Sequence, residues 1–271
     1  MEQKISACIV IKNEEKLLVR CLESIKEVVE EIIVVHDGEC RDSSLGIAKQ
    51  YTSKVFTRED RGYMEAHLPF AFARAQKEWI LRIDADEFLS SRLKKEMVNL
   101  VNRKSVDAYE FLWPLWDGER YITRRWPYKL CLFRKEAVSF LGVIHFLPEI
   151  KGNILKNDLV LHHQPSYNNF SRKMFNQKWI KWARIQAELY FKPFSQVEKF
   201  NYNKSDWPFK IKLRKKFPLF LMPLDFISTL GKDLKRGGYR EGVTGLKVAF
   251  MYACYRVTIN YYIHVQKRKK Q

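Results

Sequence analysis

The chain has 271 residues, of which 46% are hydrophobic and 14% aromatic, and its formal net charge is +18. This composition supplies enough apolar surface for a folded core, so it excludes an intrinsically disordered chain. The length corresponds to one large domain, or to one domain with an appendage. Five cysteines are scattered without a Cys-x-x-Cys pair. That pattern excludes a disulfide scaffold and a cysteine-based zinc site, and it fits a reducing compartment.

The excess positive charge is confined to the later part of the sequence. Residues 1–150 contain 24 Lys and Arg against 24 Asp and Glu, whereas residues 151–271 contain 25 against 7. We therefore predict a catalytic domain over residues 1–165. Residues 166–271 are predicted to form a basic, aromatic-rich helical region that docks on a membrane or on a substrate.

No segment of the sequence is predicted to span a membrane. The longest apolar segment, Leu246–Val265, contains Lys247 and Arg256, and an arginine near the centre of a bilayer costs about 2.5–3.5 kcal/mol. The polar first residues predict no signal peptide. Basic residues beside Phe, Leu and Trp suit an anionic membrane surface, where each Lys or Arg contributes about 1 kcal/mol. We expect a cytoplasmic protein, peripheral at the inner face of the membrane; a solvated basic face is the alternative.

In the first 90 residues, apolar runs alternate with segments of helical periodicity. Residues Leu17–Ile25 place their apolar side chains on one helical face, and Asn13 is expected to cap that helix. Strand–helix–strand order with short connections predicts a parallel sheet covered by helices. The other predicted elements are strands Ile5–Ile11, Ile32–Val35, Lys54–Thr57 and Trp79–Ile83, and helices Ser43–Tyr51 and Met64–Gln76.

After residue 90 the pattern changes, because the predicted strands follow one another without long helices between them. These strands are expected to form a mixed edge of the sheet. The apolar segment Phe217–Leu224 is broken by Pro218 and Pro223. The predicted fold class is thus α/β, with a mixed, mainly parallel sheet flanked by helices and a basic helical C-terminal extension. The predicted elements are strands Ala108–Trp113, Lys129–Phe133 and Leu159–His162, and helices Phe170–Tyr190 and Gly245–Gln266.

Polar residues follow three of the predicted parallel strands, in Lys12–Glu15, His36–Glu39 and Asp84–Glu87. Ligands bind at the edge of an open parallel sheet where the carboxyl ends of the strands lie. We therefore expect the three segments to meet around one ligand. For Asp37 the alternative is an ordinary Asp-Gly turn.

Asp84 and Asp86 are two residues apart, directly after a strand. If the backbone bends there, both carboxylates can face one pocket. Mg²⁺ and Mn²⁺ often share their coordination between one or two carboxylates and substrate phosphates. Such a cation would neutralise the charge on a departing diphosphate. A solvated acidic turn is the alternative.

These segments resemble the three signatures of family 2 glycosyltransferases, which are a strand ending in Asn-Glu, a V-D-D-G-S-x-D turn and a D-x-D. The resembling segments are Ile9–Glu15, Ile33–Gly38 and Trp79–Phe88. Later segments are similar to regions of bacterial members that build lipopolysaccharide core or related glycans; these are Lys129–Lys135, Gly142–His145 and Gly237–Ala249. The resemblance implies a GT-A fold, a nucleotide-diphospho-sugar donor linked to UDP, Mn²⁺ or Mg²⁺, and inverting transfer to a glycan or lipid-linked acceptor.

The same resemblance implies roles for individual residues. Asp37 would contact the base, Asp84 would lie near the ribose and the metal, and Asp86 and His145 would bind the metal. The sequence departs from the family pattern where His36 replaces an aspartate. The full set implied to bind the nucleotide-sugar is Asn13, Glu14, Asp37, Asp42 and Asp84.

Inverting transfer needs a general base that deprotonates the acceptor hydroxyl, and a partly buried carboxylate suits this task. We favour Glu149, because it follows His145 closely and could replace the glutamate that the family often has at the position of Phe146. The alternatives are a surface carboxylate for Glu149 and a structural histidine for His145. We expect structural roles for His162 and His163. The other candidate bases are Asp107, Glu110, Asp117 and Glu119.

Two other function classes are alternatives to sugar transfer. The basic, aromatic composition is compatible with nucleic-acid binding, but the sequence has no RNP, zinc-finger or helix-turn-helix pattern, and we expect no nucleic-acid partner. A phosphatase would use Asp84 as nucleophile and Asp86 as acid, but the pair lies far into the chain and Glu87-Phe88 follows it. Walker A and G-x-G-x-x-G loops are absent.

Overall fold

The computed structural model describes residues 4–270. The chain divides into two compact units, and each is described by itself. The first unit contains the chain up to Pro114, with Tyr128–Ser166 and Glu198–Tyr202, and the second contains Leu115–Pro127, Tyr167–Val197 and the chain from Asn203. Each unit thus takes a short segment from beyond the division predicted between residues 165 and 166.

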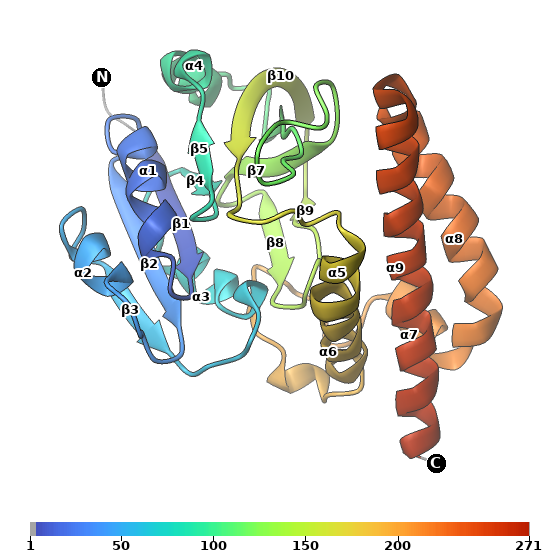
Figure 1. The fold of residues 1–271 in the computed structure, drawn as a ribbon. Coiled ribbons are helices and arrows are strands. Elements are labelled where there is room, and N and C mark those ends of the chain that lie inside the picture. The colour runs from blue at the N-terminus through green and yellow to red at the C-terminus, as the bar shows by residue number, and fades with distance from the viewer. Residues whose placement is uncertain (1–3, 271) are drawn as a thin grey trace. The chain divides into compact units, whose positions relative to one another are not determined.

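The first unit is built on an eight-stranded sheet with the order β3-β2-β1-β4-β7-β6-β10-β5. Strands β3, β2, β1, β4, β6 and β10 run in one direction, and β7 and β5 run against them. The predicted mixed, mainly parallel sheet is therefore confirmed (Figure 1). The strands are β1 Ile5–Ile11, β2 Glu31–Asp37, β3 Val55–Arg58, β4 Trp79–Arg82, β5 Glu87–Leu89, β6 Ala108–Leu112, β7 Tyr128–Arg134 and β10 Ile154–His163.

Both faces of this sheet are covered by other elements. Since side chains alternate between the two faces along a strand, a strand whose residues are all buried must be covered on both sides. Every residue of β1 and β2 is buried. Helices α1, α2 and α4 pack on one face, and α3 covers the other together with a small antiparallel sheet of order β11-β8-β9. The bounds are α1 Glu15–Ile25, α2 Ser44–Lys49, η1 Met64–Ala66, α3 Leu68–Arg74, α4 Ser91–Val101, β8 Val138–Leu141, β9 Glu149–Ile150 and β11 Lys199–Phe200.

Helix α4, between β5 and β6, was not predicted from the sequence. Leu93, Met97 and Leu100 repeat at helical spacing and are buried. The Ser90 side chain caps the helix by accepting a hydrogen bond from the backbone N–H of Leu93, a stabilising arrangement at a helix start. The expected Asn13 cap is wrong, because Glu14 occupies the cap position of α1 and makes no side-chain cap bond.

The second unit is helical, as predicted. Helices α8 and α9 pack along each other, and α6 and α7 also contact α9 (Figure 1). Contrary to expectation, Pro218 and Pro223 do not break the apolar segment, because Pro218 opens α8 and Pro223 lies inside it. The bounds are α5 Arg172–Met174, a π-helical turn Phe175–Trp179, α6 Ile180–Tyr190, η3 Phe194–Gln196, α7 Phe209–Lys216, α8 Pro218–Lys235, η4 Gly238–Glu241 and α9 Gly242–Lys269.

Over residues 4–270, no helix has both the length and the apolar composition that crossing a bilayer requires.

Candidate active site at the carboxyl edge of the sheet

The three polar segments predicted to meet do lie at one edge of the sheet. Strand β1 lies between β2 and β4 and is parallel to both, with Ile11 opposite His36 and Cys8 opposite Arg82. The segments after β1, β2 and β4 therefore leave the sheet on the same side. Because neighbouring strands are about 4.8 Å apart, the ends of β2 and β4 are separated by roughly 10 Å. We call this edge the carboxyl rim.

Asn13 and His36 join the first two loops of the carboxyl rim. The backbone of Asn13 is left-handed, with φ of 56°, a conformation in which Asn is enriched. Its N–H donates to His36 Nε2 at 3.3 Å, and His36 Nδ1 lies 2.9 Å from the carbonyl oxygen of Gly38. The imidazole therefore carries its proton on Nδ1. The histidine that departs from the family pattern thus has a structural role, and Asn13 Oδ1 accepts from the backbone of Arg41.

Glu14 and Asp42 belong to the same bracing network. The backbone N–H of Glu14 donates to Ser44 Oγ at 2.7 Å. The two carboxylate oxygens of Asp42 accept from the backbone N–H groups of Glu15 and Ser44, at 3.1 and 2.9 Å. Both predicted nucleotide-binding residues therefore tie the loop after β2 to the start of α1.

Asp37 ends β2 and its side chain is only 1% exposed. Its Oδ1 accepts from the backbone N–H of Arg61 at 2.7 Å and from His67 Nε2 at 2.8 Å, and its Oδ2 accepts from the N–H of Gly62 at 3.1 Å. Lys12 Nζ lies 3.6 Å from Oδ2. Burial alone would raise the pKa of Asp37, but these hydrogen bonds and charges outweigh it, so the pKa lies below its usual value.

His67 links Asp37 to a second charged pair. Arg58 Nη1 lies 3.4 Å from His67 Nδ1, and Arg58 Nη2 donates to Glu198 at 2.9 Å. Because arginine can only donate, His67 Nδ1 must accept, and the imidazole proton is on Nε2, where it points at Asp37. His67 thus orients the Asp37 carboxylate through its Nε2.

We predict that Asp37→Asn lowers the free energy of unfolding by about 1–3 kcal/mol at neutral pH, because a buried charge-assisted network is lost. The folded-state pKa of Asp37 is below 3.8, so its stabilisation is complete above that value and is lost as the pH falls through the folded-state pKa. The difference between wild type and variant should therefore shrink in acid. Urea unfolding at a series of pH values measures it.

The matched control is Glu39→Gln, which changes an exposed carboxylate in the same loop and should alter stability by less than about 0.5 kcal/mol. A wild-type advantage over Asp37→Asn that stays constant down to the lowest pH at which the fold persists would contradict the assignment.

At the other end of the carboxyl rim, Lys129 is clamped between two carboxylates. Its Nζ lies 2.6 Å from Asp84 Oδ2, and 2.6 and 2.7 Å from the two oxygens of Glu87. Glu87 is fully buried and also accepts from Trp113 Nε1 at 2.6 Å. Burial opposes ionisation of Asp84, but the charges of Lys129 and Arg82 outweigh it and lower its pKa to about 2. Burial, reinforced by Asp84 and Asp86, raises the pKa of Glu87.

Asp86, two residues after Asp84, lies beside a histidine. Its Oδ2 lies 3.3 Å from His163 Nε2, and its side chain is 24% exposed. The imidazole stacks on Trp113 with ring centroids 4.0 Å apart, which holds it beside the carboxylate. The backbone N–H of Gln164 donates to the Asp86 carbonyl oxygen at 2.8 Å. Two carboxylates of one turn are thus oriented by different neighbours, Lys129 for one and His163 for the other.

His145 lies in the loop after β8, beside the Asp37 network. Its backbone N–H donates to Glu65 at 3.0 Å, and Tyr63 donates from its hydroxyl to the carbonyl oxygen of Gly142 in the same loop. The contacts described for His145 are thus on the η1 side of the carboxyl rim. The histidine that the structure places beside Asp86 is His163, for which the sequence predicted only a structural role.

Glu149 lies far from the Asp84 turn along the strands. It is exposed and pairs with Ser139, near the start of β8. Strand β8 follows closely after β7, whose last residue, Arg134, pairs with Trp79 at the start of β4. Asp84 follows the opposite end of β4. This position gives no support to Glu149 as general base, and that role stays a prediction from the resemblance.

Lys129, Glu87 and His163 were missed as site residues. Glu87 directly follows the D-x-D, and Lys129 interrupts an otherwise apolar strand. The sequence position of each could therefore have indicated a role in the site. A lysine that sits in a buried strand needs a carboxylate partner. The sequence could not name that partner, because Lys129 meets Asp84 and Glu87 only through the antiparallel pairing of β7 with β4.

The oxygen ligands at the carboxyl rim fit a hard divalent cation that depends on substrate phosphates for part of its coordination. Across residues 4–270, no group of three or more His, Cys, Asp or Glu side chains is arranged to hold a metal by itself. Asp84 and Asp86 offer two carboxylates on one turn, and Mg²⁺ is commonly bound by one or two carboxylates plus substrate phosphates. The donor set therefore fits such an ion.

A mainly parallel sheet with a D-x-D turn at its carboxyl edge is typical of α/β proteins that bind a ligand at that edge. The chain belongs to glycosyl transferase family 2, whose model matches residues 6–184. This membership also leaves no basis for the phosphatase interpretation.

Curated relatives are named as glycosyltransferases. An uncharacterized glycosyltransferase of Rickettsia felis is 39% identical over 107 residues, which cover 40% of this chain and 37% of that protein. One from Rickettsia typhi is 34% identical over 149 residues, which cover 53% and 50%. The chain thus spans half the length, or less, of these relatives.

Solved structures with a similar arrangement are more distant. S. aureus TarS 1-349 in complex with UDP-GlcNAc has a TM-score of 0.48 and 13% identity, with 99% of this chain and 92% of that chain covered. Glucosyl-3-phosphoglycerate synthase from Mycobacterium tuberculosis, in complex with Mg²⁺ and UDP, has a TM-score of 0.47 and 14% identity, with 69% and 78% covered.

Proposed function

We propose that the protein transfers a sugar, with inversion, from a UDP-linked donor to a hydroxyl of a glycan or lipid-linked acceptor in the synthesis of a bacterial surface polysaccharide or lipopolysaccharide. One observation carries the proposal. The loops after β1, β2 and β4 share one edge of the sheet, inside the region matched by the family model, and that edge carries the Asp84-x-Asp86 turn.

The nucleotide would lie across the first two loops of the carboxyl rim. Gly38 has a φ of 80°, and a Cβ at this position would lie 2.8 Å from Asp60 Cβ, so only glycine permits this close approach of the two loops. Lys12 is partly exposed beside Asp37 and Asp60, and its ammonium group suits a phosphate. Asp37 supports this surface by holding the N–H groups of Arg61 and Gly62 in place.

Asp86 and Asp84 would hold a Mg²⁺ or Mn²⁺ ion, which when bound neutralises charge on the departing diphosphate. Lys129 keeps Asp84 ionised and fixes its direction. His163, immobilised by Trp113, orients Asp86. Glu149 stands as the general base only through the resemblance, and we assign no step to it, because a base must come within hydrogen-bond distance of the acceptor hydroxyl.

The acceptor and the place of action are also part of this proposal. The basic second unit fits an acceptor linked to a lipid at the cytoplasmic face of an anionic membrane, where the protein would be peripheral. Nucleic acid has no part in the proposed reaction.

Donor binding tests the proposed function directly. We expect UDP-sugars to raise the melting temperature of the chain, and Mn²⁺ to increase the shift, because a ligand that binds only the folded state stabilises it by about 2.7 kcal/mol at 100 times its Kd. Differential scanning fluorimetry over a panel of UDP-, GDP- and TDP-sugars, with and without Mn²⁺, is the measurement. Unchanged melting temperatures across the whole panel at millimolar donor would refute the proposal.

A further inference from the structure

Helix α8 exposes an apolar stripe to solvent. Phe220, Leu224 and Ile227 recur at i, i+4 and i+7, so they lie on one face, and their side chains are 73%, 52% and 67% exposed. The helix packs on α9 through other residues, among them Phe226, whose ring meets that of Phe250 at a centroid distance of 5.6 Å. A helix of a soluble monomer normally turns its apolar face inward. An exposed apolar stripe of this kind therefore indicates an interaction surface.

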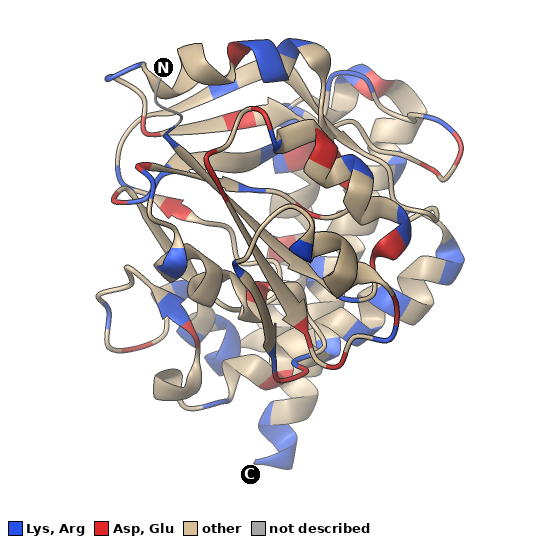
Figure 2. Ribbon diagram, turned by 90° about the vertical axis from the view of Figure 1, so that its left-hand side faces the viewer, with Lys and Arg blue, Asp and Glu red and all other residues tan. Residues whose placement is uncertain are grey.

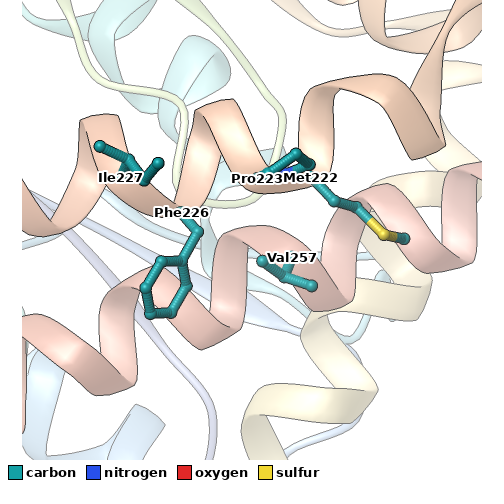
Figure 3. A pocket seen from close by; sticks show the side chains of 5 residues that line it. All are labelled: Met222, Pro223, Phe226, Ile227 and Val257. Atoms are coloured by element: carbon teal, nitrogen blue, oxygen red, sulfur yellow. The ribbon is translucent and has the colours of Figure 1, made fainter.

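The stripe continues across α9. An open apolar depression of about 400 Å³ lies between the two helices and is lined by Met222, Pro223, Phe226, Ile227 and Val257 (Figure 3). The first turns of α9 add three exposed apolar residues, Val243, Leu246 and Phe250. The apolar surface is therefore shared by both helices of the pair.

A basic pocket lies next to the start of α8. Lys212, Lys215, Lys216 and Lys267 line a depression of about 430 Å³ that contains one carboxylate, Asp206. Asp206 is paired with Lys212 at 2.7 Å, so the pocket keeps a clear excess of positive charge. Burial and the ammonium groups of neighbouring lysines lower the pKa of Lys215 against the opposing effect of Asp206, which is the expected result of crowding like charges.

Along the chain, the basic pocket is followed by the apolar stripe where α7 passes into α8. Lys216 ends α7, and its Nζ lies 5.1 Å from the ring centroid of Phe217, which precedes α8 and is 45% exposed. Cationic and apolar groups therefore succeed one another along the chain, as in helices that lie in a membrane interface.

The positive charge of residues 204–270 favours an anionic partner. Between residues 204 and 270 there are sixteen Lys and Arg against four Asp and Glu, and blue residues fill the last turn before the C-terminus in Figure 2. A second copy of this chain would bring the same positive charge and be repelled. A surface of lipid phosphates is complementary.

We propose that α7, α8 and the first turns of α9 dock on an anionic lipid bilayer, with the stripe Phe220–Leu224–Ile227 entering the interface and the lysine pocket taking lipid phosphates. The purpose of docking, access to a lipid-linked acceptor, rests on the proposed function; the docking itself does not.

Vesicle sedimentation of the full chain tests this proposal. We expect binding to vesicles of phosphatidylcholine with phosphatidylglycerol, little binding to phosphatidylcholine alone, and weaker binding at high salt. The double variant Phe220→Ser, Ile227→Ser should lower the partition coefficient about tenfold or more. Lys215→Gln with Lys216→Gln should lower it about 25-fold, since each charge is worth about fivefold. The matched control, Val19→Ser with Ile154→Ser, changes exposed apolar residues of the first unit and should bind like wild type.

Equal binding to both kinds of vesicle, or wild-type binding by the two docking variants, would overturn the proposal. So would a dimer in sedimentation velocity that Phe220→Ser dissolves, or retention of RNA without any binding to vesicles. The change in melting temperature caused by UDP in the absence of vesicles distinguishes a failure of the docking proposal from a failure of the proposed function. Docking variants that keep this shift retain an intact donor site, and a wild type that binds vesicles but not UDP would refute the proposed function alone.

Discussion

Replacing Lys129 by methionine should lower the free energy of unfolding by about 3–5 kcal/mol. The side chain of Lys129 is only 13% exposed, and its ammonium group is the charged partner of both Asp84 and Glu87. Methionine fills a similar volume but leaves a fully buried carboxylate without its counter-charge, and breaking a buried pair from one side is strongly destabilising. Urea unfolding of the wild type and the variant measures the difference.

Two further variants show whether the loss comes from the uncompensated carboxylate. Lys4→Met removes an exposed partner 3.9 Å from Glu78 and should cost less than about 1 kcal/mol. Adding Glu87→Gln to Lys129→Met should recover part of the stability, because the remaining buried charge is reduced. The loss of unfolding free energy in the double variant should be smaller than the summed losses of the two single variants. A larger loss would show that the pairing of Lys129 with Glu87 does not stabilise this turn.

Asp86→Asn should reduce sugar transfer by about a hundredfold or more while the fold is kept. The proposed function places a divalent cation on this carboxylate, and the amide that replaces it carries no charge and binds Mg²⁺ or Mn²⁺ poorly. The amide oxygen can still accept a hydrogen bond from His163, so the free energy of unfolding should change by less than about 1 kcal/mol. Initial rates with a UDP-sugar and Mn²⁺ measure the effect.

The control for this variant is Glu96→Gln, which removes a partly exposed carboxylate on α4 and should leave the rate unchanged. Full turnover by Asp86→Asn, at a melting temperature equal to that of the wild type, would remove the cation from the proposed mechanism.

Local periodicity was enough to predict most of the first unit. The buried β-branched runs became β1, β2, β3 and β4 within a few residues of their expected bounds, and the shared carboxyl rim followed from their parallel order. The resemblance to the family added the interpretation of Asp84 and Asp86 as residues near a metal ion. These features depend on residues close together in the sequence.

What the sequence did not reveal depends on tertiary packing. Pro223 was expected to break the apolar segment Phe217–Leu224. At the sixth residue of α8 it removes one backbone hydrogen bond, and the packing of α8 on α9 outweighs that cost. Strands β8, β9 and β11 are two to four residues long, so too few residues show alternation to reveal them.

In the candidate site, too, local sequence revealed some residues, whereas others depend on tertiary packing. Asp37, Asp84 and Asp86 could be found because each ends or follows a strand. Their partners could not, since His67 reaches Asp37 across 30 residues and His163 reaches Asp86 from the end of β10. Such partners are defined by strand register and helix placement rather than by spacing along the chain.

The location of a bound donor tests the central claim most directly. In a crystal structure of the chain with UDP and Mn²⁺, the account predicts the nucleotide across the loops after β1 and β2, and an anomalous peak for Mn²⁺ beside Asp86. A nucleotide bound elsewhere on the molecule, or a Mn²⁺ peak remote from the turn at residues 84–86, would contradict it.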